Sequence, residues 1–369
     1  MNDNTIFIFD AHAGMKLSRD IILSDGSLLA PKDTVLTPSL IAKISSLHVL
    51  EINIYNEDED SASQAERNAA LTRTDADNIN YYERVRNSDE FKHFESEYNV
   101  NVDSVKDNLN SFITAENNID TDTMVSETMN IMSEARNSLQ MFDMLHAMRN
   151  KDDLTFVHSV NVALIASIIG KWLNFNDEQI KTLTLAGLLH DIGKLLVPDN
   201  ILNKPGTLTD NEYEIMKHHV NLGYEQIKDK KLPLPVKEAI LLHHEKCDGS
   251  GYPFGLKSPD IPAVAKIITI ADVYDAMTAS RIYRAPICPF EVVKMMYQDA
   301  FTKFDPIYAI PFLKNVVASY IGTNVKLSDG RTGKVVLIND NALDKPIVQC
   351  GNDYVNLSKN SGLSIVSLM

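Results

Sequence analysis

Apolar residues recur every three or four positions through the middle of the chain, from about residue 89 onward. The pattern is clear in MVSETMNIMSEARNSLQMFDMLHAM, and it returns in six later segments, at 157–173, 180–196, 211–227, 236–245, 264–279 and 290–301. This spacing places apolar side chains on one face of a helix. The middle of the chain is therefore predicted to be a bundle of six or more helices.

Short stretches in which apolar and polar residues alternate lie at both ends of the chain. The first end contains IFIFD, DIILSDGSLL and VLEINIY, with a Ser-Asp-Gly turn at 24–26, and the second contains TNVKLSDGRTGKVVLIND and KPIVQCGNDYVNL, with an Asp-Gly turn at 329–330. Alternation is typical of half-buried strands, and Asp-Gly between such runs favours a hairpin. With one helix expected near LTPSLIAKISSL, the fold class is mainly α, with small β-rich modules at the N- and C-termini.

An acidic stretch of low hydrophobicity, about 57–88, separates the first module from the helices. Between residues 51 and 120 there are seventeen Asp and Glu against six Lys and Arg. Such a composition is typical of a flexible linker or a solvated helical spacer. The predicted domains are an N-terminal β-rich module at 1–56, an acidic linker and helical spacer at 57–123, a helical domain at 124–317 and a C-terminal β-extension at 318–369.

Composition narrows the class of protein. The chain has 369 residues, of which 44% are hydrophobic and 23% charged, as in a soluble protein of two or three domains. The sequence has no run of about eighteen apolar residues and no signal-peptide pattern at its start, so we expect a cytoplasmic protein. Three widely spaced cysteines without a CxxC motif predict free thiols and argue against a thiolate zinc site.

The net charge of −15 makes an extended contact with DNA or with an anionic membrane unfavourable. Both contacts depend on clustered Lys and Arg. A small anionic ligand is compatible with the charge, because metal ions and a few basic side chains provide a local positive site.

Six of the ten histidines fall between positions 158 and 244, each in or at the end of an apolar helical segment. A single histidine on an amphipathic helix is more often a hydrogen-bonded core or surface residue than a ligand. Several on facing helices can form a metal site, because the helices hold their side chains rigidly. The six are His158, His190, His218, His219, His243 and His244.

Two carboxylates accompany these histidines. Asp191 follows His190 directly, and Asp272 stands within the apolar run IITIADVYDA, where an unpaired charge would be costly. Five or six imidazoles and two carboxylates exceed what one tetrahedral zinc ion uses. Two hexacoordinate ions, iron or manganese, fit the set better.

The sequence resembles the HD-GYP phosphodiesterases of bacterial cyclic di-GMP signalling over about 125–310. Five separated blocks occur in the family's order: KDDLTFVHS ending at 159, HDIGK at 190–194, KPGTLT at 204–209 with His219 four residues before Gly223, HHEKCDGSGYP at 243–253, and ADVYDAMTASRIYR at 271–284. The resemblance implies that residues 124–317 are an HD-type helical bundle and the catalytic domain.

The resemblance also implies a binuclear metal site. Asp191 would bridge the two ions, a bridging water would attack phosphorus, and Lys194 would stabilise the charge that builds on the phosphoryl oxygens. Asp275 would support a ligand histidine, and His218 would lie on a polar face. The implied metal ligands are His158, His190, Asp191, His219, His243, His244 and Asp272.

Further residues of the family motifs would bind the substrate. Tyr252 would contact a guanine or a ribose from a loop shaped by Gly251 and Pro253, while Arg281 and Arg284 would contact phosphates. Without the family context, these are a surface turn and two solvated arginines.

Three departures from the family pattern affect the details. Some members have a third-metal carboxylate four residues before the first histidine, whereas this chain has Leu154 there and Asp153 one step away, so we expect two metals. Cys247 and Ile282 replace a common tryptophan and proline. Both can alter the cleft, and with it the preference among cyclic dinucleotides.

The implied function is hydrolysis of cyclic di-GMP to pGpG, with GMP as a further product that the sequence leaves open. Two alternatives stay open: a cyclic-dinucleotide sensor without turnover, and an HD hydrolase of another nucleotide, such as cyclic GMP-AMP. We expect no DNA and no membrane partner. The apolar stripe at 124–148 suits either a homodimer or packing on the bundle.

Overall fold

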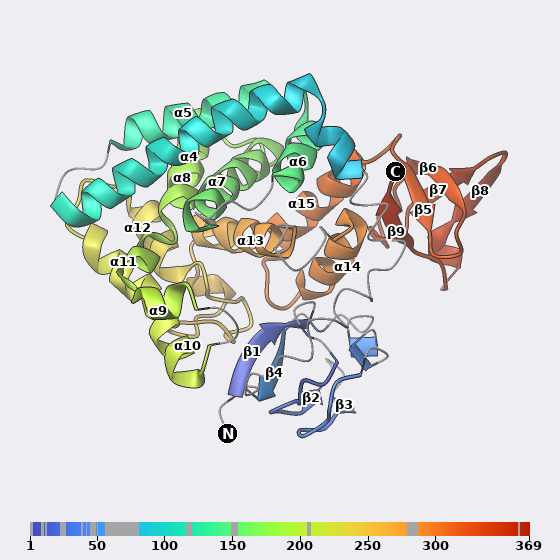
Figure 1. The fold of residues 1–369 in the computed structure, drawn as a ribbon, viewed down its shortest axis with the longest axis horizontal. Coiled ribbons are helices and arrows are strands. Elements are labelled where there is room, and N and C mark those ends of the chain that lie inside the picture. Colours follow the sequence, from blue (N-terminus) through green and yellow to red (C-terminus); the bar gives the residue numbers. More distant parts are fainter. Residues whose placement is uncertain are drawn as a thin grey trace. The chain divides into compact units, whose positions relative to one another are not determined.

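The computed structural model describes residues 3–8, 11, 13–22, 27–37, 40–41, 43–44, 49, 51–55, 81–115, 120–148, 154–204, 208–278, 287–360 and 362–369. The chain divides into two compact units, residues 1–70 with 196–219 and residues 71–195 with 220–369 (Figure 1). The four domains predicted from the sequence divide the chain differently, and their boundaries stay predictions. The turn expected at 24–26 and most of the acidic linker lie outside the described residues.

The first unit contains two small antiparallel sheets. Strand β1 (Asp3–Phe7) pairs with β4 (Glu51–Tyr55), and β2 (Ile21–Ile22) pairs with β3 (Leu28–Ala30). Their apolar side chains meet in one small core, because alternate residues of a strand face the same side. Two short helices, α9 (Asp199–Leu202) and α10 (Asp210–Lys217), belong to this unit. The fully buried core residues include Ile8, Leu17, Leu36, Ile44, Ile52 and Ile54.

The second unit is a helical bundle followed by a sheet. In chain order, the helices in its described part are α4 (Asp89–Ala115), α5 (Thr121–Glu134), α6 (Ser138–Ala147), α7 (Leu154–Trp172), α8 (Asp177–Leu189), α11 (His219–Ile227), α12 (Leu234–Leu242), α13 (Ala263–Thr278), α14 (Pro289–Asp299) and α15 (Pro306–Ser319). A 3₁₀ turn, η2 (Ile192–Leu196), follows α8, and a second, η3 (Ser258–Asp260), precedes α13. The predicted fold class, mainly α with small β-rich modules at both termini, is confirmed.

Helices α7, α8 and α13 form the centre of the bundle (Figure 1). A Cβ atom at Gly187 of α8 would lie 2.5 Å from the Cα of Ala163, so α7 and α8 cross in direct backbone contact. Only glycine permits this approach, because any side chain at that position would collide with α7. The crossing brings the start of α7 close to the end of α8, where His158 and His190 stand.

Helix α7 is apolar enough over residues 155–172 to satisfy the length and composition of a membrane span. However, 72% of this stretch is buried inside the protein. Burial of this extent is typical of the core helix of a soluble protein, which passes the same test.

Helices α4 and α5 run side by side and pack on the bundle (Figure 1). The apolar face of α4, which lies in the segment predicted as linker and spacer, is buried through Phe94, Tyr98 and Val105. The stripe at 124–148 is also covered within the chain, since α5 packs on α7 and α8. Of the two readings of that stripe, packing on the bundle is confirmed, and a homodimer stays a prediction.

The C-terminal residues form an antiparallel sheet of five strands in the order β8-β7-β6-β5-β9. The Asp-Gly turn predicted at 329–330 joins β5 and β6, and Gly330 adopts a φ of 89° there, which suits glycine. The strands are β5 (Asn324–Leu327), β6 (Thr332–Leu337), β7 (Ile347–Cys350), β8 (Asp353–Asn356) and β9 (Ile365–Leu368), with a 3₁₀ turn, η4 (Leu357–Lys359), before the last.

Candidate metal centre

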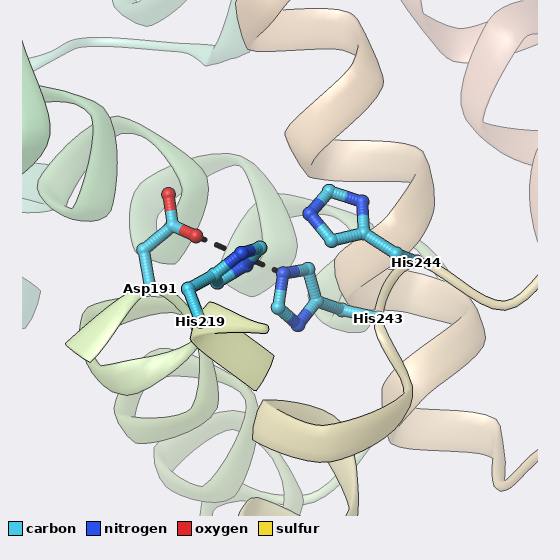
Figure 2. Close-up of side chains that lie close together, drawn as sticks. All are labelled: Asp191, His219, His243 and His244. Atoms are coloured by element: carbon cyan, nitrogen blue, oxygen red, sulfur yellow. Dashed lines mark ion pairs between the residues drawn. The ribbon is translucent and has the colours of Figure 1, made fainter. Parts of the chain in front are cut away.

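Seven side chains that are far apart in the sequence converge in two adjoining groups. Within each group, one potential ligand atom per residue lies within 4.8 Å of every other. The side chains come from α7 and α13, from the ends of α8 and α12, and from the start of α11. One group is His158, His190 and Asp272, and the other is Asp191, His219, His243 and His244 (Figure 2).

Three of the histidines are fixed by backbone carbonyl oxygens three or four residues earlier in the chain. The Nδ1 atom of His190 donates to the Gly187 oxygen at 2.7 Å, and that of His219 donates to the Met216 oxygen at 2.8 Å. The Nδ1 atom of His243 lies 3.1 Å from the carbonyl oxygens at 239 and 240. Because a carbonyl can only accept, each Nδ1 carries a proton, and in the neutral imidazole the lone pair is therefore on Nε2. The backbone thus sets the tautomer that a metal ion requires.

The fourth histidine, His158, is held by side chains instead. Its Nδ1 atom donates to Oδ2 of Asp275 at 2.7 Å, and its Nε2 atom lies 2.9 Å from Oδ1 of Asp272. The other oxygen of Asp275 accepts from the amide of Asn161 at 2.8 Å, and the Asn161 oxygen accepts from the Tyr98 hydroxyl at 2.6 Å. A chain of buried hydrogen bonds therefore runs from α4 through α7 and α13 to this imidazole. It includes the contact between Asp275 and a candidate ligand histidine that the sequence led us to expect.

Asp191 stands between the two groups. Its Oδ2 atom lies 3.3 Å from Nε2 of His190 and 3.6 Å from Nε2 of His158, which belong to the other group. Its Oδ1 atom faces Nε2 of His243 at 3.8 Å, the ion pair dashed in Figure 2. Lys194 donates to Oδ2 at 2.6 Å from the turn η2. A carboxylate with one oxygen toward each group can bridge two cations.

Without a metal ion, His158 carries a proton at neutral pH. Burial alone would lower the pKa of His158, but the hydrogen bonds to Asp272 and Asp275 raise it to about 10. Burial alone would raise the pKa of Asp272, yet its hydrogen bond with His158 holds that pKa well below the usual range. A positive charge thus already occupies the space between these carboxylates, and a cation binding there would replace the proton.

The donor set fits divalent cations. All seven potential ligand atoms are nitrogen or oxygen, and His190, Asp191 and His243 are almost fully buried. Buried carboxylates among imidazoles whose lone pairs converge are unfavourable unless a cation or proton compensates them. Imidazole together with carboxylate suits iron, manganese or zinc, and does not suit copper(I) or an iron–sulfur cluster.

The loop after the paired histidines returns to the site. The ring of Tyr252 stacks on His244 with ring centroids 4.7 Å apart and planes 26° apart. A Cβ atom at Gly251 would lie 2.4 Å from the carbonyl oxygen of His244, so this glycine lets the loop lie directly on the chain that carries the ligands.

Most of the residues singled out in the sequence lie in the described part of the chain. Lys194, Gly251 and Tyr252 all contact the cluster or its chain, and His218 is exposed while His219 is buried, as expected. The two arginines, Arg281 and Arg284, lie outside the described residues.

Sequence reasoning missed Asn161 and Tyr98. Asn161 could have been found, because it stands three residues after His158 and shares its helix face. Nothing in the sequence marks Tyr98, since its partner is 63 positions away.

Comparisons with known proteins agree with this geometry. A family model described as an HD domain matches residues 127–307. A cyclic di-GMP phosphodiesterase of Pseudomonas aeruginosa is 37% identical over 203 residues, which are 55% of this chain and 49% of that protein. The 3'3'-cGAMP-specific phosphodiesterase 1 of Vibrio cholerae is 41% identical over 146 residues, which are 40% of this chain and 34% of that protein.

Among solved structures, a protein of Bdellovibrio bacteriovorus described as an HDG"Y"P protein has a TM-score of 0.51 at 18% identity, covering 86% of this chain and 99% of that one. This likeness concerns the fold. The aligned regions span about half or less of the two curated relatives. The HD-domain model matches residues 127–307, about half of this chain, and this match agrees with the resemblance inferred from the sequence motifs.

Proposed function

We propose that the chain is a metal-dependent phosphodiesterase that hydrolyses cyclic di-GMP to pGpG. The observation that carries this proposal is the convergence of seven imidazole and carboxylate side chains, Asp191 among them. The names of the sequence relatives, cyclic di-GMP and 3'3'-cGAMP phosphodiesterases, support it. GMP is a further product if the same site also cuts pGpG.

Two divalent cations, iron or manganese, would be held by these residues. One would be bound by His158, His190 and Asp272, the other by His219 and His243, with Asp191 between them. The family resemblance assigns His243 and His244 to one ion each, and His244, which is grouped with His243, also has its Nδ1 atom 3.9 Å from Oδ2 of Asp272. When bound, such ions supply Lewis acidity and lower the pKa of water to near neutrality. The carbonyl acceptors at Nδ1 orient three of the imidazoles for this binding.

Lys194 has two tasks in the proposed reaction. Its ammonium group donates to Asp191 and so fixes the bridging carboxylate. The side chain is one-quarter exposed, so it can also reach a phosphoryl oxygen. Negative charge that develops on that oxygen would be stabilised by the ammonium group.

Substrate binding is assigned to the loop and to the two arginines. Gly251 and Pro253 shape the loop that holds Tyr252 beside His244, which suits a contact with a base or ribose. Arg281 and Arg284 are proposed to bind phosphates on the family resemblance. The relatives' names include both cyclic di-GMP and 3'3'-cGAMP, so either cyclic dinucleotide is a candidate substrate.

The proposed location is the cytoplasm, which the three free cysteines support. We propose no DNA and no membrane as partners, because the acidic chain offers little attraction to either. A homodimer is retained as a partner on the basis of the sequence alone.

Anaerobic purification, metal analysis and incubation with cyclic di-GMP and with 3'3'-cGAMP test the function. The proposal expects iron- or manganese-loaded protein to convert cyclic di-GMP to pGpG, as seen by chromatography. Protein that is loaded with metal, binds the nucleotide and leaves it uncut would be a sensor. Protein that consumes only 3'3'-cGAMP would be a hydrolase of another substrate.

A further inference from the structure

Residues 248–257, called the GYP loop from here on, are closed at their base. Asp248 and Lys257 form an antiparallel bridge, and Oδ1 of Asp248 accepts from the backbone N–H of Ser250 at 2.9 Å. The base fixes where the loop begins and ends. The path of the loop between these points depends on other contacts.

The first half of the loop is attached to the ligand chain. The backbone N–H of Tyr252 donates to the carbonyl oxygen of His244 at 3.2 Å, and the rings of these two residues stack. Gly251 lies against the backbone of residues 244–246. The backbone of residues 244–246 therefore positions both His244 and Tyr252.

The second half of the loop is attached to one side chain, that of Glu245. Its Oε1 atom accepts from the backbone N–H of Phe254 at 2.7 Å, and its Oε2 atom accepts from that of Leu256 at 2.8 Å. Glu245 is only 2% exposed, although it follows two candidate metal ligands and belongs to neither ligand group. In the described part of the chain, no Lys or Arg forms an ion pair with it, so its buried charge depends on these two N–H groups.

The loop held in this way presents an aromatic ring to solvent. Phe254, between Pro253 and Gly255, is 60% exposed, although its backbone N–H is anchored by a buried carboxylate. An exposed aromatic ring on a fixed backbone is a suitable surface for stacking a nucleobase, since every base has a π-face.

We propose that Glu245 is a positioning residue that holds the GYP loop in the shape in which Phe254 stacks on a base of the substrate. This inference rests on the proposed function, and it extends that function to a residue that neither binds metal nor contacts the reacting atoms. Removing one acceptor oxygen should release the N–H of either Phe254 or Leu256, removing both should release the second half of the loop, and the candidate metal ligands should stay in place.

The test compares Glu245→Gln and Glu245→Asp with a control, Glu225→Gln. Glu225 is mostly exposed and pairs only with Lys228 among the described residues, so the control makes the same chemical change away from the loop. Hydrogen exchange at the amides of residues 254 and 256 is measured with metal content, kcat and KM. Glu245→Gln keeps one acceptor oxygen and should speed exchange about tenfold at one of these amides, whereas the shorter side chain of Glu245→Asp should speed it at both. Each variant should raise KM about tenfold, the effect of losing one charge-assisted hydrogen bond. Metal content and kcat should change less than about threefold.

Phe254→Ala separates the ring from its anchor. It keeps the backbone N–H, so exchange at residue 256 should stay as in the wild type while KM rises, by about tenfold for the loss of one stacked base. Unchanged exchange and unchanged KM in both Glu245 variants would overturn the positioning role. An unchanged KM in Phe254→Ala would overturn the stacking.

Failure of the proposed function gives a different result. Wild-type protein would then leave every cyclic dinucleotide uncut, while exchange at residues 254 and 256 would still report whether Glu245 holds the loop. If Glu245→Asp lost metal to the same extent as its KM rose, Glu245 would maintain the metal centre itself. This result would also contradict the inference.

Discussion

The two groups of candidate metal ligands are held in different ways. Three histidines, two of them in the Asp191 group, are fixed by backbone carbonyls, which no substitution removes. His158, in the other group, is fixed by Asp275, which in turn depends on Asn161 and Tyr98. The first arrangement is built into the helix ends, whereas the second depends on a chain of side chains. Mutation and pH should therefore change metal binding by the His158 group much more than metal binding by the Asp191 group.

The largest effect is expected where the two groups meet. Asp191→Ala removes the carboxylate that faces both groups, so both ions should be lost and activity should fall at least about a thousandfold. Elemental analysis and turnover of cyclic di-GMP measure this. Asp177→Ala, at the exposed start of the same helix α8, is the control and should retain both ions. Retention of one full equivalent of metal by Asp191→Ala would show that Asp191 does not join the groups.

The next effect distinguishes the two kinds of support. Asp275→Ala removes the acceptor at Nδ1 of His158 and should weaken metal binding or activity about 10- to 100-fold, the usual effect of losing a partner behind a ligand. Met216→Leu changes the residue behind His219 but leaves its carbonyl in place, so metal affinity should be unchanged. Metal titration followed by calorimetry measures both. Equal losses in the two variants would contradict the comparison.

A third effect concerns protons. Below its pKa of about 10, His158 must release a proton before Nε2 can bind a cation, whereas Asp272, whose pKa is lowered, is already ionised at neutral pH. Affinity for the ion in the His158 group should therefore rise about tenfold per pH unit between about pH 7 and pH 9, and level off above the pKa. Calorimetry in buffers of different ionisation enthalpy should detect about one released proton. A pH-independent affinity would contradict this charge state.

The smallest effect is expected at the far end of the hydrogen-bond chain. Tyr98→Phe removes the hydroxyl that donates to Asn161 and should lower the free energy of unfolding by about 1–2 kcal/mol, because the buried amide oxygen loses its donor. Metal affinity should fall only a few-fold. Thermal unfolding and metal titration measure these changes, with Tyr354→Phe, on an exposed ring, as the control. A loss as large as that of Asp275→Ala would mean that Tyr98 supports the site in another way.

The sequence was sufficient to predict the mainly α fold and the HD domain, because the helical periodicity is strong and the motifs are several and ordered. It was also sufficient to nominate the seven side chains that the structure brings together, since each stands in or beside a motif block. Their role as ligands stays a proposal. The sequence left out Asn161, Tyr98 and Glu245, because their roles depend on hydrogen bonds to partners that the local pattern does not reveal.

The packing of α4 was also beyond the sequence. Its acidic composition indicated a spacer, yet one face supplies Phe94 and Tyr98 to the core. A helix with many charges on one side can still bury the other, so net composition is a poor guide to whether it packs.

The most direct test of the central claim is the number of metal ions per chain in anaerobically purified protein, measured together with hydrolysis of cyclic di-GMP. We predict two iron or manganese ions per chain, with activity that is lost on chelation and restored by adding the metal back. Full hydrolysis by metal-free protein, or saturation at a single ion with full activity, would contradict the account.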